Sequence, residues 1–242
     1  MCTVSWLHQD DGYQLLCNRD EKRSRANAFG PEIKKRDGVL YLAPTDQTAG
    51  GTWIGTNEFG VSVCLLNGSP NSGSSVGRTY RSRGLLLPEL LSAESLVEVS
   101  ERVWAFDLSS FAPFTLAVLE TGQHATAIEW DGQEKTILPY AEPHMPLVSS
   151  SFDPEGVHSK RRDEFHKLVN SAPSLVTGLL AAFHTSHGAG PDAYSPCMHR
   201  PDAETVSFSW VTVMDSEIRF SYAAGAPCRQ PPVVIRNLPR LQ

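Results

Sequence analysis

The second residue of the sequence is a cysteine, and the polar cluster Asn18-Arg19-Asp20-Glu21 follows it closely. The small side chain of Cys2 favours removal of Met1, after which one residue carries both a thiol and a free α-amine. An α-amine titrates near ~7.7–8.0 and a thiol near ~8.5, so the amine can accept the thiol proton at neutral pH. The sequence therefore predicts a nucleophile and its general base on Cys2.

A β-hairpin is expected to connect Cys2 with the polar cluster. Two short apolar runs, residues 3–7 and 13–17, flank Asp11-Gly12, and Asp-Gly between two such runs is typical of a hairpin turn. Because a hairpin folds its far end back beside its beginning, we expect Asp20 to lie next to Cys2.

The start of the chain, MC followed by NRDE at the end of a hairpin, resembles the NRDE family, which includes the Transport and Golgi organisation protein 2 group. It is also similar to the cysteine branch of the N-terminal-nucleophile (Ntn) hydrolases, to which penicillin V acylase and bile salt hydrolase belong. In those enzymes an aspartate at the hairpin end holds the α-amine, and the resemblance implies this role for Asp20. The alternative is that Cys2 is an ordinary small apolar residue and NRDE a charged turn.

The other residues of the cluster have further candidate roles. Asn18 is expected to orient the terminus or the hairpin. Arg19 is a candidate substrate-binding residue; alternatively, Arg19 and Glu21 form an ion pair of structural use only, on the strand face opposite Asp20.

A second predicted hairpin, with strands over 52–56 and 61–66, ends at Asn67. The stretch GTNEFGVSVCLLN is similar to the G-x-N-x-x-G, then L-N, pattern of the bile salt hydrolase and penicillin V acylase group. There the closing asparagine donates its side-chain amide to the oxyanion of the tetrahedral intermediate, and the resemblance implies this role for Asn67. The alternative is a turn formed by Asn67 and Gly68.

Two polar stretches near these motifs are expected to be loops. Residues 22–40 are basic and rich in turn formers; alternatively, Arg23, Arg25, Lys34 or Lys35 meets an anionic substrate. Residues 68–81 form a glycine-rich loop that could act as a lid. A leucine-rich helix follows Ser82-Arg83-Gly84, a start that also resembles the NRDE family. Arg83 is a candidate substrate-binding residue or a structural arginine at the start of the helix.

The rest of the chain alternates between strand and helix patterns. Strands are expected over 114–120, 125–130, 136–140, 205–214 and 218–223, and helices over 158–170 and 174–187. The proline-rich tail after Cys228 is expected to lie extended on the surface. These elements predict an α+β protein with helices packed on antiparallel sheet. The resemblance implies the four-layer αββα Ntn-hydrolase sandwich, two antiparallel sheets between helical layers, in a single domain over 1–242.

Two departures from the related families weaken the assignment of an enzyme. Where the acylases carry a threonine–asparagine pair before a proline, this chain has Ser150 or Ser151 in place of the asparagine. Where other NRDE members have an arginine in a late strand, it has Val206.

Four residues near the end of the chain could be read as zinc ligands: His184, His187, Cys197 and His199. Structural zinc sites usually pair ligands two to four residues apart twice over, and the C-x-H spacing here is unusual. We therefore predict no metal and no cofactor. The tail instead resembles the acyl-CoA-dependent penicillin acyltransferase group, with its cysteine–basic–histidine turn, a T-V-S strand and a closing G-x-P-C.

Composition excludes several other classes of protein. A net charge of −6 and a pI near 5.7 argue against nucleic acid as a partner, which requires a basic face. No apolar run approaches the ~20 residues of a membrane span, and no signal sequence is apparent. The five scattered cysteines suit reduced thiols in the cytoplasm.

The sequence thus predicts an N-terminal-cysteine amide hydrolase or acyltransferase that acts on a small acylated substrate. The alternative is a non-catalytic trafficking or carrier protein for haem or acyl-CoA-type ligands, which the resemblance to the Transport and Golgi organisation group also implies.

Overall fold

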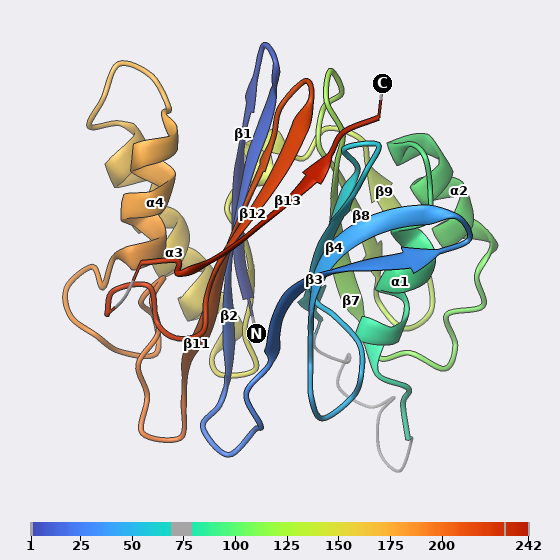
Figure 1. Ribbon diagram of the computed structural model, residues 1–242. Coiled ribbons are helices and arrows are strands. Elements are labelled where there is room, and N and C mark those ends of the chain that lie inside the picture. Colours follow the sequence, from blue (N-terminus) through green and yellow to red (C-terminus); the bar gives the residue numbers. More distant parts are fainter. Residues whose placement is uncertain (1, 69–78, 230, 242) are drawn as a thin grey trace.

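Two antiparallel β-sheets stacked face to face form the centre of the protein, and helices cover the outer face of each (Figure 1). The computed structural model describes residues 2–68, 79–229 and 231–241. Most of the predicted lid loop, residues 69–78, lies outside the described part. Within that part, no helix is long and apolar enough to cross a membrane.

The first sheet has the strand order β10-β1-β2-β11-β12-β13. Its strands are β1 (Cys2–Gln9), β2 (Gly12–Lys22), β10 (Leu147–Ser149), β11 (Ala203–Val213), β12 (Glu217–Ala223) and β13 (Val234–Pro239). Its outer face is covered by α3 (Pro154–Val169) and α4 (Thr177–Thr185).

The second sheet has the strand order β3-β4-β5-β6-β7-β8-β9. Its strands are β3 (Phe29–Arg36), β4 (Val39–Thr45), β5 (Ile54–Asn57), β6 (Ser62–Asn67), β7 (Phe114–Leu119), β8 (Thr126–Trp130) and β9 (Lys135–Leu138). Its outer face carries α1 (Leu87–Leu90) and α2 (Leu96–Ala105), and short 3₁₀ turns occur at Arg83–Leu85 and Glu142–His144. The predicted α+β sandwich is confirmed.

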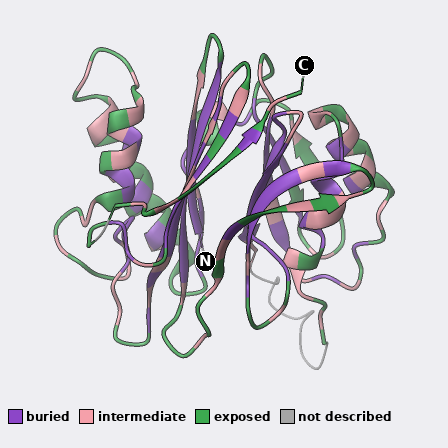
Figure 2. Cartoon of the chain, viewed as in Figure 1, coloured by how far each residue is buried: buried purple, intermediate pink, exposed green. Residues whose placement is uncertain are grey.

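Apolar side chains fill the space between the sheets, and a second cluster lies under α1 and α2. Trp6, Tyr13 and Phe220 are among the large side chains that are fully buried between the sheets. Figure 2 shows this burial along the inner strands, whereas the outer helix faces and the loops are exposed. Ser95 caps α2 by accepting a hydrogen bond from the Glu98 N–H, as an N-cap residue does.

The expectation of a loop over 22–40 holds for residues 23–28 and is wrong for the rest, because β3 and β4 form a hairpin there. Asp37 and Gly38 make its turn. Their φ values are 50° and 91°, and positive φ at both central residues suits a tight two-residue hairpin turn. Since β3 is an edge strand and most of its side chains are at least partly exposed, its sequence is polar and resembles that of a loop.

The tail does lie extended and mostly exposed, but part of it forms β13, which pairs with β12 and adds an edge strand to the first sheet. Leu238 is buried there, whereas Ile235 is exposed. A single buried leucine after a proline-rich segment gives no clear alternation, so the strand was not apparent from the sequence.

Buried polar contacts attach α4 to the first hairpin. Nε2 of His184 lies 2.8 Å from the Ser5 hydroxyl, and the Asn18 side-chain amide donates to the His184 carbonyl at 2.8 Å. Burial lowers the pKa of His184 to about 3, and the positive charge of Arg161 acts in the same direction. The imidazole is therefore neutral in the folded protein at neutral pH.

This neutral histidine predicts a loss of stability in acid. Below about pH 6.5 the unfolded chain protonates His184 while the folded chain does not, so the free energy of unfolding falls as the pH falls. The contribution of this group is at most ~1.4 kcal/mol per pH unit. Urea unfolding between pH 7 and 5 should show a shallower pH dependence for His184→Gln than for the wild type. The matched control is His144→Gln at an exposed histidine, which should keep the wild-type slope; an unchanged slope in His184→Gln would contradict the prediction.

Candidate active site

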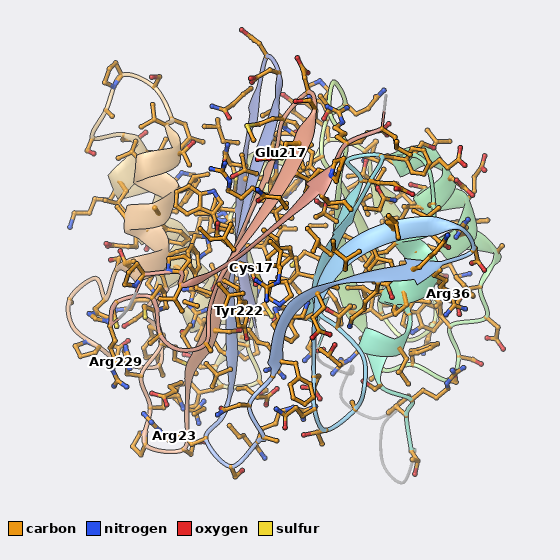
Figure 3. All side chains as sticks on the ribbon, viewed as in Figure 1. Cys17, Arg23, Arg36, Glu217, Tyr222 and Arg229 are labelled. Atoms are coloured by element: carbon orange, nitrogen blue, oxygen red, sulfur yellow. The ribbon has the colours of Figure 1, made fainter. Side chains whose placement is uncertain are left out.

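Cys2 begins β1, and its side chain points toward the second sheet. It is only 4% exposed and pairs directly with Arg19 of β2, so both side chains lie on the same face. A hydrogen bond with the Cys17 thiol, burial, and the negative charge of Asp20 raise the pKa of the Cys2 thiol well above its ordinary value. A positive N-terminus acts in the opposite direction. Figure 3 labels Cys17, in the middle of β2.

The main-chain nitrogen of Cys2 donates a hydrogen bond to the Ser149 hydroxyl at 2.9 Å. Ser149 ends β10 and lies directly opposite Cys2 in the strand register. Removal of Met1 would convert this nitrogen into the α-amine. Ser149 therefore contacts the atom that we expect to act as base. Ser150 bonds to the main chain of Phe152 in the turn before α3.

Asp20 is fully buried on the opposite face of β2, toward α3. One carboxylate oxygen lies 3.0 Å from Nη1 of Arg161, and the other accepts a hydrogen bond of 2.6 Å from the Thr205 hydroxyl. Arg161 is itself 1% exposed and also donates to the Thr3 hydroxyl. Arg161 was not singled out from the sequence, where it is one of several basic residues in a polar helix.

A cavity of about 440 Å³ opens beside the thiol. It is lined by four of the residues proposed from the sequence: Cys2, Arg19, Asn67 and Arg83. The other two proposed residues, Asn18 and Asp20, make hydrogen bonds on the helix side of β2. Successive side chains of a strand point to opposite faces, so the NRDE cluster is divided between the cavity and the helical layer.

Asn67 is the last residue of β6 and lies opposite Phe114 of β7. Arg83 fixes the main chain beside it, because its Nη1 donates to the carbonyls of Gly68 at 3.3 Å and Pro113 at 2.7 Å. Burial lowers the pKa of Arg83 from its ordinary value. Arg83 is thus both a cavity residue and a support for the strand end that carries Asn67.

Arg19 is held in place by an ion pair with Asp46 and by stacking of its guanidinium over the Trp53 ring, with 4.3 Å to the centroid. Arg25 adds hydrogen bonds of 2.9 Å to both oxygens of the same carboxylate. Burial would raise the pKa of Asp46, but the hydrogen bonds from Arg25 and the charge of Arg19 outweigh it and leave the pKa below its ordinary value. A carboxylate oxygen of Glu21 also lies 3.7 Å from Arg19. The role of Asp46 as an ion-pair partner of Arg19 was not apparent from the sequence.

Positive charge predominates among the described residues that line the cavity. Its charged residues are four arginines and two acids: Arg19, Arg25, Arg81, Arg83, Glu21 and Asp46. Val206, where other NRDE members have an arginine, lies at a β-bulge of β11 and faces a small neighbouring cavity that Arg19 also lines.

The stacked sheets, with a cysteine at the head of an inner strand, form the fold of the Ntn hydrolases. One similar solved structure is the Caenorhabditis elegans N-acylethanolamine-hydrolyzing acid amidase (NAAA) ortholog, with a TM-score of 0.58, 14% identity and coverage of 86% of this chain and 92% of that one. Penicillin V acylase from Agrobacterium tumefaciens gives a TM-score of 0.54, 10% identity and coverage of 92% of this chain and 83% of that one. The C2A mutant of conjugated bile acid hydrolase from Clostridium perfringens gives a TM-score of 0.54, 14% identity and coverage of 99% of this chain and 92% of that one. At these identities the similarity establishes the fold alone.

The sequence itself identifies the family. Residues 1–192 match the family model described as Transport and Golgi organisation 2, and the chain belongs to that family. Comparison with curated proteins gives no significant sequence match. The predicted family and the predicted Ntn fold are confirmed.

The buried Asp20–Arg161 pair leads to a prediction about stability. Asp20→Asn or Arg161→Met alone leaves one buried group without its charged partner, which typically costs ~3–5 kcal/mol. The double variant should lose less than the sum of the two single losses, as measured by urea unfolding in a double-mutant cycle.

The matched control is the Arg219–Glu217 pair, whose side chains are 49% and 38% exposed. An exposed pair of this kind should show a coupling energy below ~1 kcal/mol. Additive losses for Asp20 and Arg161 would show that their contact does not stabilise the fold.

Proposed function

We propose that this protein is an Ntn cysteine hydrolase or acyltransferase that cleaves the amide or a related acyl bond of a small substrate. The observation that carries the proposal is the cavity shared by Cys2 and Asn67 at the end of an inner strand. Its volume of about 440 Å³ falls within the range of small-molecule sites, ~300–1,000 Å³. The Ntn fold and the family membership are consistent with it.

The proposed reaction begins when the Cys2 sulfur attacks the substrate carbonyl carbon and the thiol proton passes to the α-amine of the same residue. The Asn67 amide donates to the oxyanion of the tetrahedral intermediate. Collapse of the intermediate breaks the carbon–nitrogen bond, and the leaving amine takes the proton from the α-ammonium. Water, or an acceptor nucleophile in an acyl transfer, then attacks the thioester and releases the thiol.

The environment of Cys2 makes such an internal base necessary. Its hydrogen bond to Cys17 and its burial favour the protonated thiol, so little thiolate exists without a base. The hydrogen bond to Ser149 holds the nitrogen of Cys2 beside its own side chain. The Asp20 carboxylate, behind the nucleophile, favours the α-ammonium that forms when the thiol proton moves.

The charge of the cavity supports a substrate with an anionic group. Four arginines against two acids leave a surplus of positive charge near the nucleophile. Within the described residues, Arg81 and Arg83 form no ion pair with a carboxylate, unlike Arg19 and Arg25. An N-acyl amino acid with a free carboxylate is therefore a suitable first substrate.

The second candidate function is a non-catalytic carrier for haem or acyl-CoA-type ligands. It is favoured by the raised pKa of the Cys2 thiol and by Val206 in place of an arginine. A carrier would use the basic cavity for binding alone. A cytoplasmic location is part of both proposals, on the basis of the scattered cysteines of the sequence.

The first test is the mass of the protein before and after reaction with a p-nitrophenyl acyl ester. We expect Met1 to be absent and one acyl group to be attached to the N-terminal peptide that begins at Cys2. Cys2→Ala should abolish this adduct, whereas the matched variant Cys64→Ala should retain it. Met1 retained in material that hydrolyses an N-acyl amino acid would contradict the mechanism. A mature Cys2 terminus without acylation would favour the carrier.

The second test concerns the oxyanion. Asn67→Ala should lower kcat for an N-acyl amino acid by ~10²–10³-fold, because one donor to the intermediate is lost. Alkylation of Cys2 by iodoacetamide, which forms no oxyanion, should proceed at the wild-type rate. Asn27→Ala, at an exposed asparagine outside the cavity, is the control. A wild-type kcat in Asn67→Ala would restrict that residue to a structural role.

A further inference from the structure

Four potential metal ligands come together at the end of the first sheet where β11 begins and β12 ends. His187, Cys197 and His199 lie in the connection between α4 and β11, and Cys228 follows β12. One ligand atom from each residue lies within 4.8 Å of all the others. His184, which the sequence had grouped with them, is instead buried against Ser5.

The distances within this cluster suit a shared metal ion. Nε2 of His199 lies 3.6 Å from the sulfur of Cys197 and 3.3 Å from the sulfur of Cys228. With Zn–S bonds of ~2.3 Å and Zn–N bonds of ~2.0–2.1 Å at tetrahedral angles, a sulfur and a nitrogen ligand are separated by ~3.6 Å. The His187 and His199 rings lie 5.0 Å apart between centroids and are inclined at 66°. A modest contraction would bring all four atoms to tetrahedral spacing.

The surroundings of the two histidines supply independent observations. Nε2 of His187 is buried and has no hydrogen-bond partner among the described residues. Nδ1 of His199, the ring nitrogen that does not face the sulfurs, lies 4.0 Å from a carboxylate oxygen of Glu204. A carboxylate behind a ligating imidazole is a common arrangement at metal sites.

The Glu204 carboxylate is itself held by two arginines. Its oxygens lie 2.7 Å from Arg23 and 3.5 Å from Arg229. Figure 3 labels both arginines at the end of the first sheet where β2 and β11 are joined to their loops. These contacts fix the carboxylate beside His199.

We propose that His187, Cys197, His199 and Cys228 bind one zinc ion in a closed tetrahedral site. Two sulfurs and two imidazole nitrogens form a ligand set that suits zinc. Each cysteine binds as a thiolate and releases its proton to solvent, so the two thiolates balance the charge of Zn²⁺. Because four protein ligands leave no open position, the ion would be structural rather than catalytic.

The site would hold the loop that supports the back of the nucleophile. Met198, between two of the ligands, donates its N–H to the Thr205 hydroxyl at 2.8 Å, and that hydroxyl donates to Asp20. The carbonyl of Pro196 accepts a hydrogen bond of 2.9 Å from Asn18. The metal would thus fix the loop whose main chain contacts two residues of the NRDE cluster.

A cobalt titration of the reduced, full-length protein tests this proposal without reference to activity. We expect about one Co²⁺ per chain, with visible bands typical of tetrahedral cobalt and an ultraviolet band from thiolate ligation, and displacement of the cobalt by Zn²⁺. Cys228→Ala, in an exposed loop, and His187→Ala, which keeps both sulfurs, should each weaken binding at least tenfold. The matched control is Cys64→Ala, which removes a thiol outside the cluster and should bind as the wild type does.

Three results would overturn the proposal. The first is no stoichiometric cobalt or zinc binding after reduction; a Cys197–Cys228 disulfide in the unreduced protein would then account for the two sulfurs. The second is a six-coordinate cobalt spectrum without thiolate ligation. The third is wild-type affinity in both Cys228→Ala and His187→Ala, which would place the ion elsewhere.

Discussion

The ion pair between Asp20 and Arg161 is the contact on which the arrangement around Cys2 depends. It joins β2 to α3 with both side chains almost completely excluded from water. A buried pair is tolerated only when its remaining donors and acceptors are also satisfied, and here the hydroxyls of Thr3 and Thr205 take part. Since Thr3 belongs to β1 and Thr205 to β11, one guanidinium and one carboxylate fix three neighbouring strands and a helix behind Cys2.

The twofold period of β2 explains how one short motif can serve two surfaces. Arg19 follows Cys17 on the inner face and reaches the cavity, whereas Asn18 and Asp20 alternate with them and contact the helical side. The charged pairs on the two faces of β2 differ in their access to solvent. Asp20 is paired away from solvent, whereas the Arg19–Asp46 pair lies beside an open cavity.

The parts of this structure that could be predicted from sequence have local signals. Asp11-Gly12 specifies the first hairpin, and a side chain at Gly12 would meet the Val213 carbonyl at 1.9 Å, so glycine is required there. The partners of the site could not be predicted in the same way. Ser149, Asp46 and Arg161 reach their positions through pairings between distant segments, and nothing in their immediate sequence marks them. The edge strands β3 and β13 were missed because an edge strand buries too little to impose an apolar alternation.

The same limit explains why Cys228 was not grouped with His187, Cys197 and His199 from the sequence. Cys228 is 29 residues from His199 in sequence, and the two meet because β11 and β12 form a hairpin whose open ends lie together. Spacing rules for structural zinc sites describe pairs of ligands a few residues apart, and Cys228 has no such neighbour among the other ligands. Because β11 also pairs with β2, one residue, Thr205, hydrogen-bonds both to the main chain beside this cluster and to Asp20. A movement of the loop should therefore act on the carboxylate behind Cys2, because the cluster and Cys2 lie at the same end of the first sheet.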